Sequence, residues 1–294
     1  MMERLNVRLD WFANTNHTGF LLAQKRGWFA KEGLEVIIDG HVHGTMTMED
    51  DLDFVCGPQV AMMKCMEQGV KMTAVAVMNQ KCDSGIVSLK EAGITRPRDL
   101  EGKRLTHWDP DWYHKTIGRL VENDGGDYSK VKLIQMDVGD IVSTLGNIAD
   151  ATWVYENWEN YVLKEAGKEI NYFNLGDFDP IFNFCAPAMA ASRKILEDRP
   201  EAVKKFLGIL DRAYREVCAD PELVLEVKDM MPEGCSDEML VASQRHLAEI
   251  MLDDKGRWGR IYPERWNPMA EYLVEVGVIS KRFENEYTTE YFPE

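Results

Sequence analysis

The feature that most constrains this chain is a regular alternation of short apolar segments with amphipathic ones along its first hundred residues. The short segments have the length and spacing of strands, and the amphipathic ones have the period of helices. The pattern predicts strands at 5–9, 34–38, 52–56, 72–78 and 85–89, and helices at 20–32 and 58–68. A chain that alternates strands and helices in this way forms a mostly parallel sheet covered by helices.

The middle of the chain repeats the alternation, and the last third is helical. Further strands are predicted at 104–107, 131–136, 151–155, 171–175 and 186–191, with helices at 113–122 and 141–149. Helices then follow at 200–219, 221–230, 237–251 and 268–276. Pro200 and Pro221 each precede an acidic residue, which is typical of a first helical turn. We therefore expect two α/β units followed by a helical tail.

Length and charge exclude several classes of protein. A chain of 294 residues favours two lobes over a single core. Its net charge of −16 argues against nucleic-acid binding, which needs a basic surface to neutralise phosphates. No run of about 18 apolar residues occurs, so no transmembrane helix is predicted.

The location of the protein is left open by its first residues and its cysteines. Residues 1–10 (MMERLNVRLD) contain neither an apolar core nor a small-residue cleavage site of a signal peptide. The six cysteines are scattered, without metal-ligand spacing, and we interpret them as reduced core residues. As written, the sequence favours a cytoplasmic protein. It would be extracytoplasmic if a signal segment had been removed.

One segment carries a specific resemblance. Residues 10–19 read DWFANTNHTG, and residues 23–36 follow the pattern A-x3-G-W-F-x2-E-G-L-x-V. The chain resembles the substrate-binding proteins for thiamine-pyrimidine precursors (formylaminopyrimidine-type) of ABC transporters, relatives of the fungal hydroxymethylpyrimidine phosphate synthases. The likeness extends over about residues 5–290. Less specific matching segments lie at 93–95, 99–103, 136–139, 149–151, 199–206 and 219–222.

The resemblance implies an α/β, two-lobe periplasmic-binding-protein type II fold. Each lobe would hold a mixed, mostly parallel sheet flanked by helices. We expect lobe one to comprise 1–88 and 195–294, lobe two to comprise 89–194, and a ligand cleft to lie between them. Binding would then proceed by hinge closure of the lobes around the ligand.

The loop after the first strand has the composition of a binding site. It joins the carboxyl end of a strand to a helix, which is where open α/β sheets bind ligands. Trp11 offers a flat apolar face, and hydrogen-bonding groups come from Asn14, Asn16, His17 and Thr18. The alternative is a loop whose side chains only cap the following helix.

Two further strand-to-helix loops are predicted to reach the same cleft. The first, over 107–114, contains Trp108, Asp109 and Trp112. The second, over 153–158, contains Trp153, Tyr155 and Glu156. Aromatic faces accompanied by a few acids suit a flat, neutral or weakly cationic heterocycle better than an anion. Each tryptophan taken singly fits core packing equally well.

The sequence departs from the synthase pattern at the positions that matter for catalysis. The resemblance places the cofactor-holding Lys and the consumed His of the synthases at about Gly57 and Ala61. Their Cys-rich iron motif falls near residues 182–186, where only Cys185 remains beside Asn183 and Phe184. The carboxylate of the pyrimidine binders, expected at about 184–186, is also absent, and Glu156 or Asp109 could replace it. We therefore expect a protein that is not an enzyme and holds no cofactor or metal.

A shortened connection between residues 38 and 52 is the second departure. His41 and His43 would lie on one face of an extended segment and form half of a metal site. No third ligand is identifiable, so we interpret His41 as lining one edge of the cleft.

These observations predict a solute-binding protein that captures a small flat heterocycle, a thiamine-pyrimidine precursor or an analogue, for ABC-type uptake. Its partners would be this ligand and an ABC permease, with no nucleic acid and no membrane insertion. Gly57, Asn183 and Phe184 complete the predicted ligand-binding residues. The alternatives are a cytoplasmic enzyme of pyrimidine or thiamine-precursor biosynthesis on the same fold and a sulfonate-type anion-binding protein.

Overall fold

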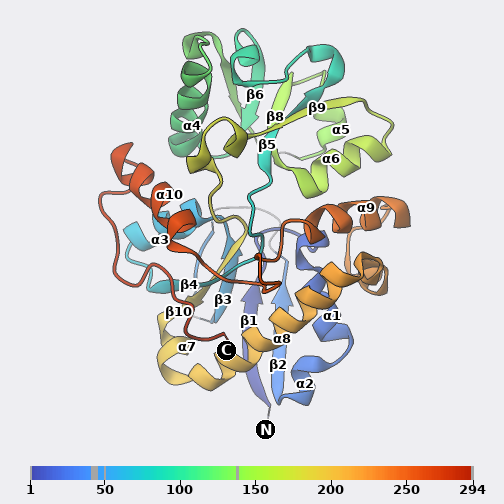
Figure 1. Cartoon of the computed structure of the whole chain (residues 1–294), viewed down its shortest axis with the longest axis vertical. Helices are drawn as coiled ribbons and strands as arrows, with labels where there is room; N and C mark the ends of the chain where they lie inside the picture. The colour runs from blue at the N-terminus through green and yellow to red at the C-terminus, as the bar shows by residue number, and fades with distance from the viewer. Residues whose placement is uncertain (1, 41–45, 50, 137–138, 293–294) are drawn as a thin grey trace. The chain divides into compact units, whose positions relative to one another are not determined.

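The computed structural model describes residues 2–40, 46–49, 51–136 and 139–292. The chain forms two compact units (Figure 1): unit 1 is Met1–Lys81 with Phe184–Glu294, and unit 2 is Cys82–Asn183. The sequence had placed the boundaries at 88/89 and 194/195. They differ because β5 (Ser84–Leu89) pairs with strands of unit 2, whereas β10 (Ala188–Ser192) pairs with strands of unit 1.

Unit 1 is built on a five-stranded sheet in the order β2-β1-β3-β10-β4. The strands are β1 (Glu3–Arg8), β2 (Leu34–Asp39), β3 (Phe54–Gly57), β4 (Met72–Val77) and β10. β10 runs antiparallel to both of its neighbours, and β1 pairs parallel with β2 and β3. Four of the five strands therefore point one way, as expected for a mixed, mostly parallel sheet.

Unit 2 repeats this arrangement with the order β7-β6-β8-β5-β9. Its strands are β5, β6 (Arg104–His107), β7 (Lys132–Gln135), β8 (Ala151–Tyr155) and β9 (Ile170–Asn174). Here β5 is the reversed strand, antiparallel to β8 and β9. β6 pairs parallel with β7 and β8, so their carboxyl ends meet at one edge of the sheet.

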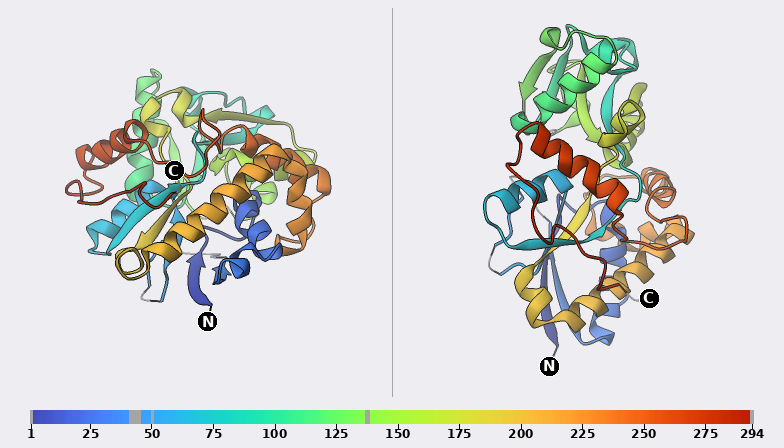
Figure 2. Two further views of the ribbon diagram at one scale, coloured as in Figure 1. Left: turned by 60° about the horizontal axis from the view of Figure 1, so that its bottom comes forward. Right: turned by 60° about the vertical axis from the view of Figure 1, so that its left-hand side comes forward.

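Helices cover the sheet of each unit. In unit 1 they are α1 (Thr18–Lys25), α2 (Trp28–Lys31), α3 (Gln59–Glu67), α7 (Arg193–Asp198), α8 (Pro200–Ala219), α9 (Asp237–Ala248) and α10 (Pro263–Glu275). In unit 2 they are α4 (Pro110–Asn123), α5 (Ile141–Thr144) and α6 (Glu156–Glu165). The C-terminal segment returns along β4, where Ala74 N donates to Glu286 O at 2.9 Å (Figure 2). No helix in the described part of the chain is long and apolar enough to cross a membrane.

Several helix boundaries differ from the predictions for local reasons. The helix predicted at 20–32 is divided into α1 and α2 because Gly27 adopts a left-handed conformation with φ of 67°. Residues 221–230 form a 3₁₀ helix, not an α-helix. Pro268, predicted to begin a helix, lies inside α10 because Pro263 already occupies its first turn.

The segments predicted as loops at 107–114 and 153–158 belong mostly to regular elements: 110–114 lie in α4, 153–155 in β8 and 156–158 in α6. Asp109 caps α4 by accepting a hydrogen bond from Asp111 N, and Pro110 occupies the first turn. Trp112 therefore lies in a helix and not in a loop. Glu156 likewise lies in the first turn of α6, since β8 passes into α6 without an intervening loop.

A stacked aromatic pair ties α8 to the C-terminal segment in the core of unit 1. The rings of Tyr214 and Trp258 are nearly parallel, with centroids 4.4 Å apart. The Tyr214 hydroxyl donates to Asn16 O at 2.7 Å, so stacking and hydrogen bonding both fix this ring. Gly19 of α1 lies against it: a Cβ atom at Gly19 would come within 2.6 Å of the Tyr214 ring.

We predict that Gly19→Ala destabilises the protein, although alanine normally stabilises a helix more than glycine does. The added methyl group would overlap a ring that cannot move away, and overpacking costs about 1–3 kcal/mol. Urea unfolding measured by circular dichroism should show a lower midpoint. Gly118→Ala in α4 is the control, because its Cβ would meet Tyr128 only at 3.3 Å. A midpoint of Gly19→Ala at or above that of the wild type would contradict the packing argument.

Candidate functional site

The loop after β1 is a compact turn whose polar side chains bond to one another. Asn14 caps the 3₁₀ turn Thr15–His17 by accepting a hydrogen bond from Asn16 N at 2.9 Å. His17 Nδ1 accepts from Asn14 N at 3.2 Å, so the ring proton lies on Nε2 and faces Asp10 Oδ1 at 2.7 Å. Asn14, Asn16, His17 and Thr18 are all buried.

This turn is also bonded to distant parts of unit 1. Thr18 Oγ1 donates to Gln244 Oε1 of α9 at 2.6 Å, and Thr15 Oγ1 lies 2.7 Å from Ser243 Oγ. Asn79 Nδ2 donates to Asn16 Oδ1 at 3.3 Å. Four of the five residues predicted from this loop therefore contribute to a buried polar network. Their hydrogen bonds within the protein explain their residue types without a ligand.

Trp11 is the predicted residue of this loop that remains partly accessible. Its side chain is half-buried, and its ring centroid lies 3.9 Å from that of Phe12. The buried hydrogen-bond network described above fixes the backbone of the turn that follows Trp11. Trp11 is thus the most accessible of the residues predicted from this segment.

Gly57 ends β3 and is covered by another side chain. A Cβ atom there would come within 2.8 Å of Met46 Sδ. Cys65 Sγ donates to Met46 O at 3.1 Å, which holds the segment over this strand end. A longer side chain at position 57 would have to displace Met46.

Asn183 and Phe184 lie where the chain passes from unit 2 back to unit 1. Asn183 Oδ1 accepts a hydrogen bond from Cys82 N at 2.8 Å, and Phe184 is buried. The guanidinium of Arg265 donates to Phe184 O at 2.7 Å and also to Asn79 O. The described hydrogen bonds of these two predicted site residues therefore fix the backbone next to the point where the chain leaves unit 2.

Unit 2 contains an aromatic cluster at the carboxyl ends of β6 and β8. Trp153 is buried and contacts three rings: Tyr113 at 4.1 Å, Trp112 at 5.6 Å and Trp108 at 6.3 Å between centroids. Trp108 also lies edge-on to Tyr113 at 5.0 Å. Trp108 is 40% exposed, whereas the other three rings are at most 5% exposed. The structure thus brings three predicted tryptophans together and presents one of them to solvent.

Acidic residues accompany these rings. Asp109 follows Trp108, and Glu156 follows the half-buried Tyr155 at the end of β8. Glu156 N donates to Asp83 O at 2.9 Å, and Asn157 N donates to Asp83 Oδ2 at 3.1 Å, so a third carboxylate lies at the start of α6. The charges next to the aromatic cluster are therefore mainly negative.

Glu159 is a residue that the sequence analysis missed. It lies in α6, only 5% exposed, and burial raises the pKa of its carboxyl to about 8, with a smaller contribution from Asp83. At neutral pH the carboxyl is therefore mostly protonated. A signal was present: Glu159 precedes the buried Leu163 by four residues, so a carboxyl lies on the apolar face of the helix. Tyr113, whose burial raises its pKa well above the usual range, was also missed.

Among the described residues, no three His, Cys, Asp or Glu side chains are grouped so that they could hold a metal ion. His41 and His43 lie outside the described part of the chain, as do residues 137–138.

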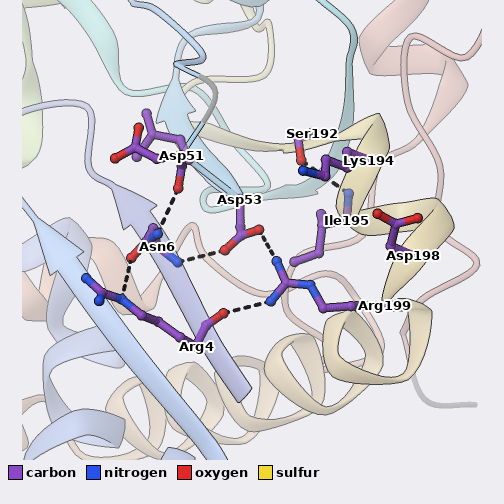
Figure 3. A pocket seen from close by; sticks show the side chains of 10 residues that line it. Arg4, Asn6, Asp51, Asp53, Ser192, Lys194, Ile195, Asp198 and Arg199 are labelled. Atoms are coloured by element: carbon purple, nitrogen blue, oxygen red, sulfur yellow. Dashed lines mark hydrogen bonds and ion pairs between the residues drawn. The ribbon is translucent and has the colours of Figure 1, made fainter. Parts of the chain in front are cut away.

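Unit 1 has a separate hollow of about 230 Å³ at the opposite edge of its sheet (Figure 3). It lies by the amino ends of β1 and β3, where Arg199 pairs with Asp53 and donates to Arg4 O at 2.7 Å. Asn6 N donates to Asp53 Oδ2 at 2.9 Å. These groups neutralise one another, and the hollow is remote from the strand ends at which Trp11 and Gly57 lie.

Comparison with known proteins identifies the family. The profile of the NMT1/THI5-like family matches residues 14–223. The chain belongs to this family. The resemblance drawn from residues 10–36 is thereby confirmed.

Relatives in the family include both binding proteins and enzymes. The formylaminopyrimidine-binding protein of Halalkalibacterium halodurans is 26% identical over 283 residues, covering 92% of this chain and 85% of the relative. The 4-amino-5-hydroxymethyl-2-methylpyrimidine phosphate synthase of Uromyces fabae is 22% identical, covering 98% and 87% respectively. Family membership alone therefore does not decide between binding and catalysis.

Similarity to solved structures confirms the predicted fold. The structure of the periplasmic aliphatic sulphonate binding protein SsuA from Escherichia coli superposes with a TM-score of 0.72 and 12% sequence identity. The superposition covers 97% of this chain and 91% of the SsuA chain. The chain of this NMT1/THI5-like protein therefore has a periplasmic-binding-protein fold. At this identity the likeness shows the fold alone.

We predict that Thr18→Val destabilises the ligand-free protein by about 1–3 kcal/mol, the cost of leaving the buried Gln244 carbonyl without its donor. The substitution keeps the shape of the side chain, so packing changes little. A lower unfolding midpoint in urea would show the effect. The exposed Thr289→Val is the control, and equal midpoints for the two variants would contradict the structural role of the network.

We predict that Glu159→Gln stabilises the protein increasingly as pH rises from about 4.5 to about 8. The folded state keeps a proton on Glu159 in this range, whereas the unfolded chain, with a pKa near 4.5, releases it. As the pH rises through this range, the free energy of unfolding of the wild type therefore falls, relative to that of the variant, by on the order of 1 kcal/mol per pH unit.

Thermal unfolding from pH 4 to pH 9 should show the two midpoints converging at low pH and separating at high pH. The exposed Glu165→Gln at the end of α6 serves as the control. A difference that does not vary with pH would show that Glu159 titrates normally.

Proposed function

We propose that this protein binds a small flat heterocycle, a thiamine-pyrimidine precursor or an analogue, and delivers it to an ABC-type permease. The observation that carries the proposal is the aromatic cluster of unit 2, in which the exposed Trp108 is supported by Tyr113 and Trp153. A tryptophan that is 40% exposed and held in place by buried rings is a preorganised stacking surface.

The acids beside this surface favour a neutral or weakly cationic ring. Asp109 and Glu156 lie next to the aromatic residues in the chain and are partly accessible. A phosphate or sulfonate would be repelled by these carboxylates, whereas the amino groups of a heterocycle could donate hydrogen bonds to them. This argument ranks the sulfonate-binding alternative lower, although a sulfonate binder shares the fold.

The surroundings of Gly57 support binding over the synthase alternative. Glycine can neither anchor a cofactor nor act as a base, and Met46 fills the space above it. On unit 1 we propose Trp11 as the ligand-contacting residue, with the network of Asn14, Asn16, His17 and Thr18 fixing its loop. A permease partner is proposed from the formylaminopyrimidine-binding relative and the binding-protein fold.

The function is tested by thermal-shift and calorimetric titration with a 4-aminopyrimidine, an alkanesulfonate and pyridoxal phosphate. We predict that the aminopyrimidine raises the melting temperature, since a ligand at about a hundred times its Kd adds about 2.7 kcal/mol. Trp108→Ala should weaken its binding about tenfold, because loss of a stacking partner costs about 0.5–1.5 kcal/mol beyond the lost buried area.

Ile148→Ala is the matched control, since Ile148 is an exposed apolar residue of the same unit but lies away from the cluster in the chain. Trp11→Ala tests whether unit 1 contributes to affinity. If the alkanesulfonate raised the melting temperature and the aminopyrimidine did not, the protein would instead be assigned as an anion-binding protein. Turnover of an aminopyrimidine or of pyridoxal phosphate would instead support an enzyme.

A further inference from the structure

Asp10 is an acidic residue at the carboxyl edge of the unit 1 sheet that the sequence analysis did not assign to the site. It follows Leu9, whose N–H donates to Asp39 O at 2.8 Å and so extends the pairing of β1 with β2 by one residue. Asp10 is therefore the first residue past the paired strand, immediately before Trp11. Loops that leave the carboxyl ends of parallel strands are where open α/β sheets bind ligands.

One oxygen of the Asp10 carboxylate is held by a buried histidine. His17 Nε2 lies 2.7 Å from Asp10 Oδ1, and His17 is 0% exposed. The imidazole is fixed from its other side, because its Nδ1 accepts a hydrogen bond from Asn14 N at 3.2 Å. An imidazole that accepts at Nδ1 carries its proton on Nε2 and is neutral. The histidine therefore orients the carboxylate without supplying a compensating charge.

The second oxygen of Asp10 has no hydrogen-bond donor in the described part of the chain, and the carboxylate forms no ion pair with a described Lys or Arg. By contrast, Asp39 at the end of β2 pairs with Arg8 at 3.3 Å. The Asp10 side chain is 19% exposed, so a molecule in solution can reach it. A largely buried carboxylate that is oriented by one donor and lacks a second is suited to a charge-assisted hydrogen bond from an N–H group.

We propose that Asp10 is the carboxylate that recognises an amino group of the bound heterocycle, and that His17 is the residue that positions it. The amino group donates to one carboxylate oxygen while His17 donates to the other. Unit 1 thereby supplies the acid that the resemblance leads us to expect at 184–186 and that is absent there. The carboxylate of Asp109, in comparison, already accepts a hydrogen bond from Asp111 N as the cap of α4.

This inference rests on the proposed function, because it assumes that a heterocycle contacts unit 1 at the loop that carries Trp11. Its test is a comparison of two probes, 4-amino-2-methylpyrimidine and 2-methylpyrimidine, which differ only in the amino group. Calorimetry at about pH 7 should show that the wild type binds the amino probe at least about tenfold more tightly, a difference of about 1.4 kcal/mol.

Asp10→Asn should reduce this preference to about twofold or less while changing the affinity for 2-methylpyrimidine little. Asparagine keeps the shape of the side chain, and its Oδ1 can still accept from His17. Its NH2 group, however, would face the amino group of the probe donor to donor. Asp10→Ser, which also lacks the carboxylate, should have the same effect and decides the question if Asp10→Asn fails to fold. Asp39→Asn is the matched control, because it removes an acid at the end of the neighbouring strand and should leave the preference unchanged.

The positioning role of His17 is tested on the unaltered protein. A long-range ¹H–¹⁵N spectrum should show one neutral histidine that carries its proton on Nε2 and whose resonances shift in Asp10→Asn. A His17 ring that is protonated on Nδ1, or on both nitrogens, would overturn this role.

Two outcomes would overturn the assignment of Asp10. The first is a preference for the amino probe that persists in Asp10→Asn. The second is an equal loss of affinity for both probes, since a purely structural carboxylate would not distinguish them. Failure of the proposed function is recognised separately, because neither probe then binds the wild type.

Discussion

The position of β10 between β3 and β4 in the unit 1 sheet is the constraint on which the rest of the structure depends. β10 pairs antiparallel with both β3 and β4, yet it follows the whole of unit 2 in the chain. Without it, the facing backbone groups of β3 and β4 would lack partners. Unit 1 is therefore complete only after unit 2 has been synthesised. β5 has the corresponding role between β8 and β9, so each unit depends on a reversed strand next to a chain crossing.

The two units use the ends of their strands differently. In unit 1 the turn after β1 directs its polar side chains inward, where they bond to α9 and to Asn79, and Trp11 stays partly accessible. In unit 2 the end of β6 presents Trp108 over buried rings, with acids beside it. The first arrangement provides a rigid support, and the second provides an apolar face of a shape that suits a flat ring. Burying polar groups is favourable only where they find partners, yet both units bury some atoms without one among the described residues, such as Gln244 Nε2 in unit 1 and Tyr113 Oη in unit 2.

Gly57, which the resemblance places at about the cofactor-holding Lys of the synthases, has a well-defined packing environment. Glycine at 57 allows Met46 to lie against the end of β3, and any larger side chain would compete for the same space. The family includes both binding proteins and synthases, and in this chain an apolar thioether fills the space above position 57.

The sequence by itself determined the alternation of elements and the family. Strands 104–107 and 151–155 and helix 200–219 were predicted to the residue, because apolar periodicity and a proline in the first turn are local signals. Local signals also reveal which residue types gather at strand ends, so Trp108 and Trp153 could be predicted to meet. Only the tertiary structure decided what those side chains contact. Thr18 bonds to Gln244, a residue 226 positions away, and burial within unit 2 raises the pKa of the Glu159 carboxyl to about 8. Burial and long-range pairing arise from packing, which no local pattern encodes.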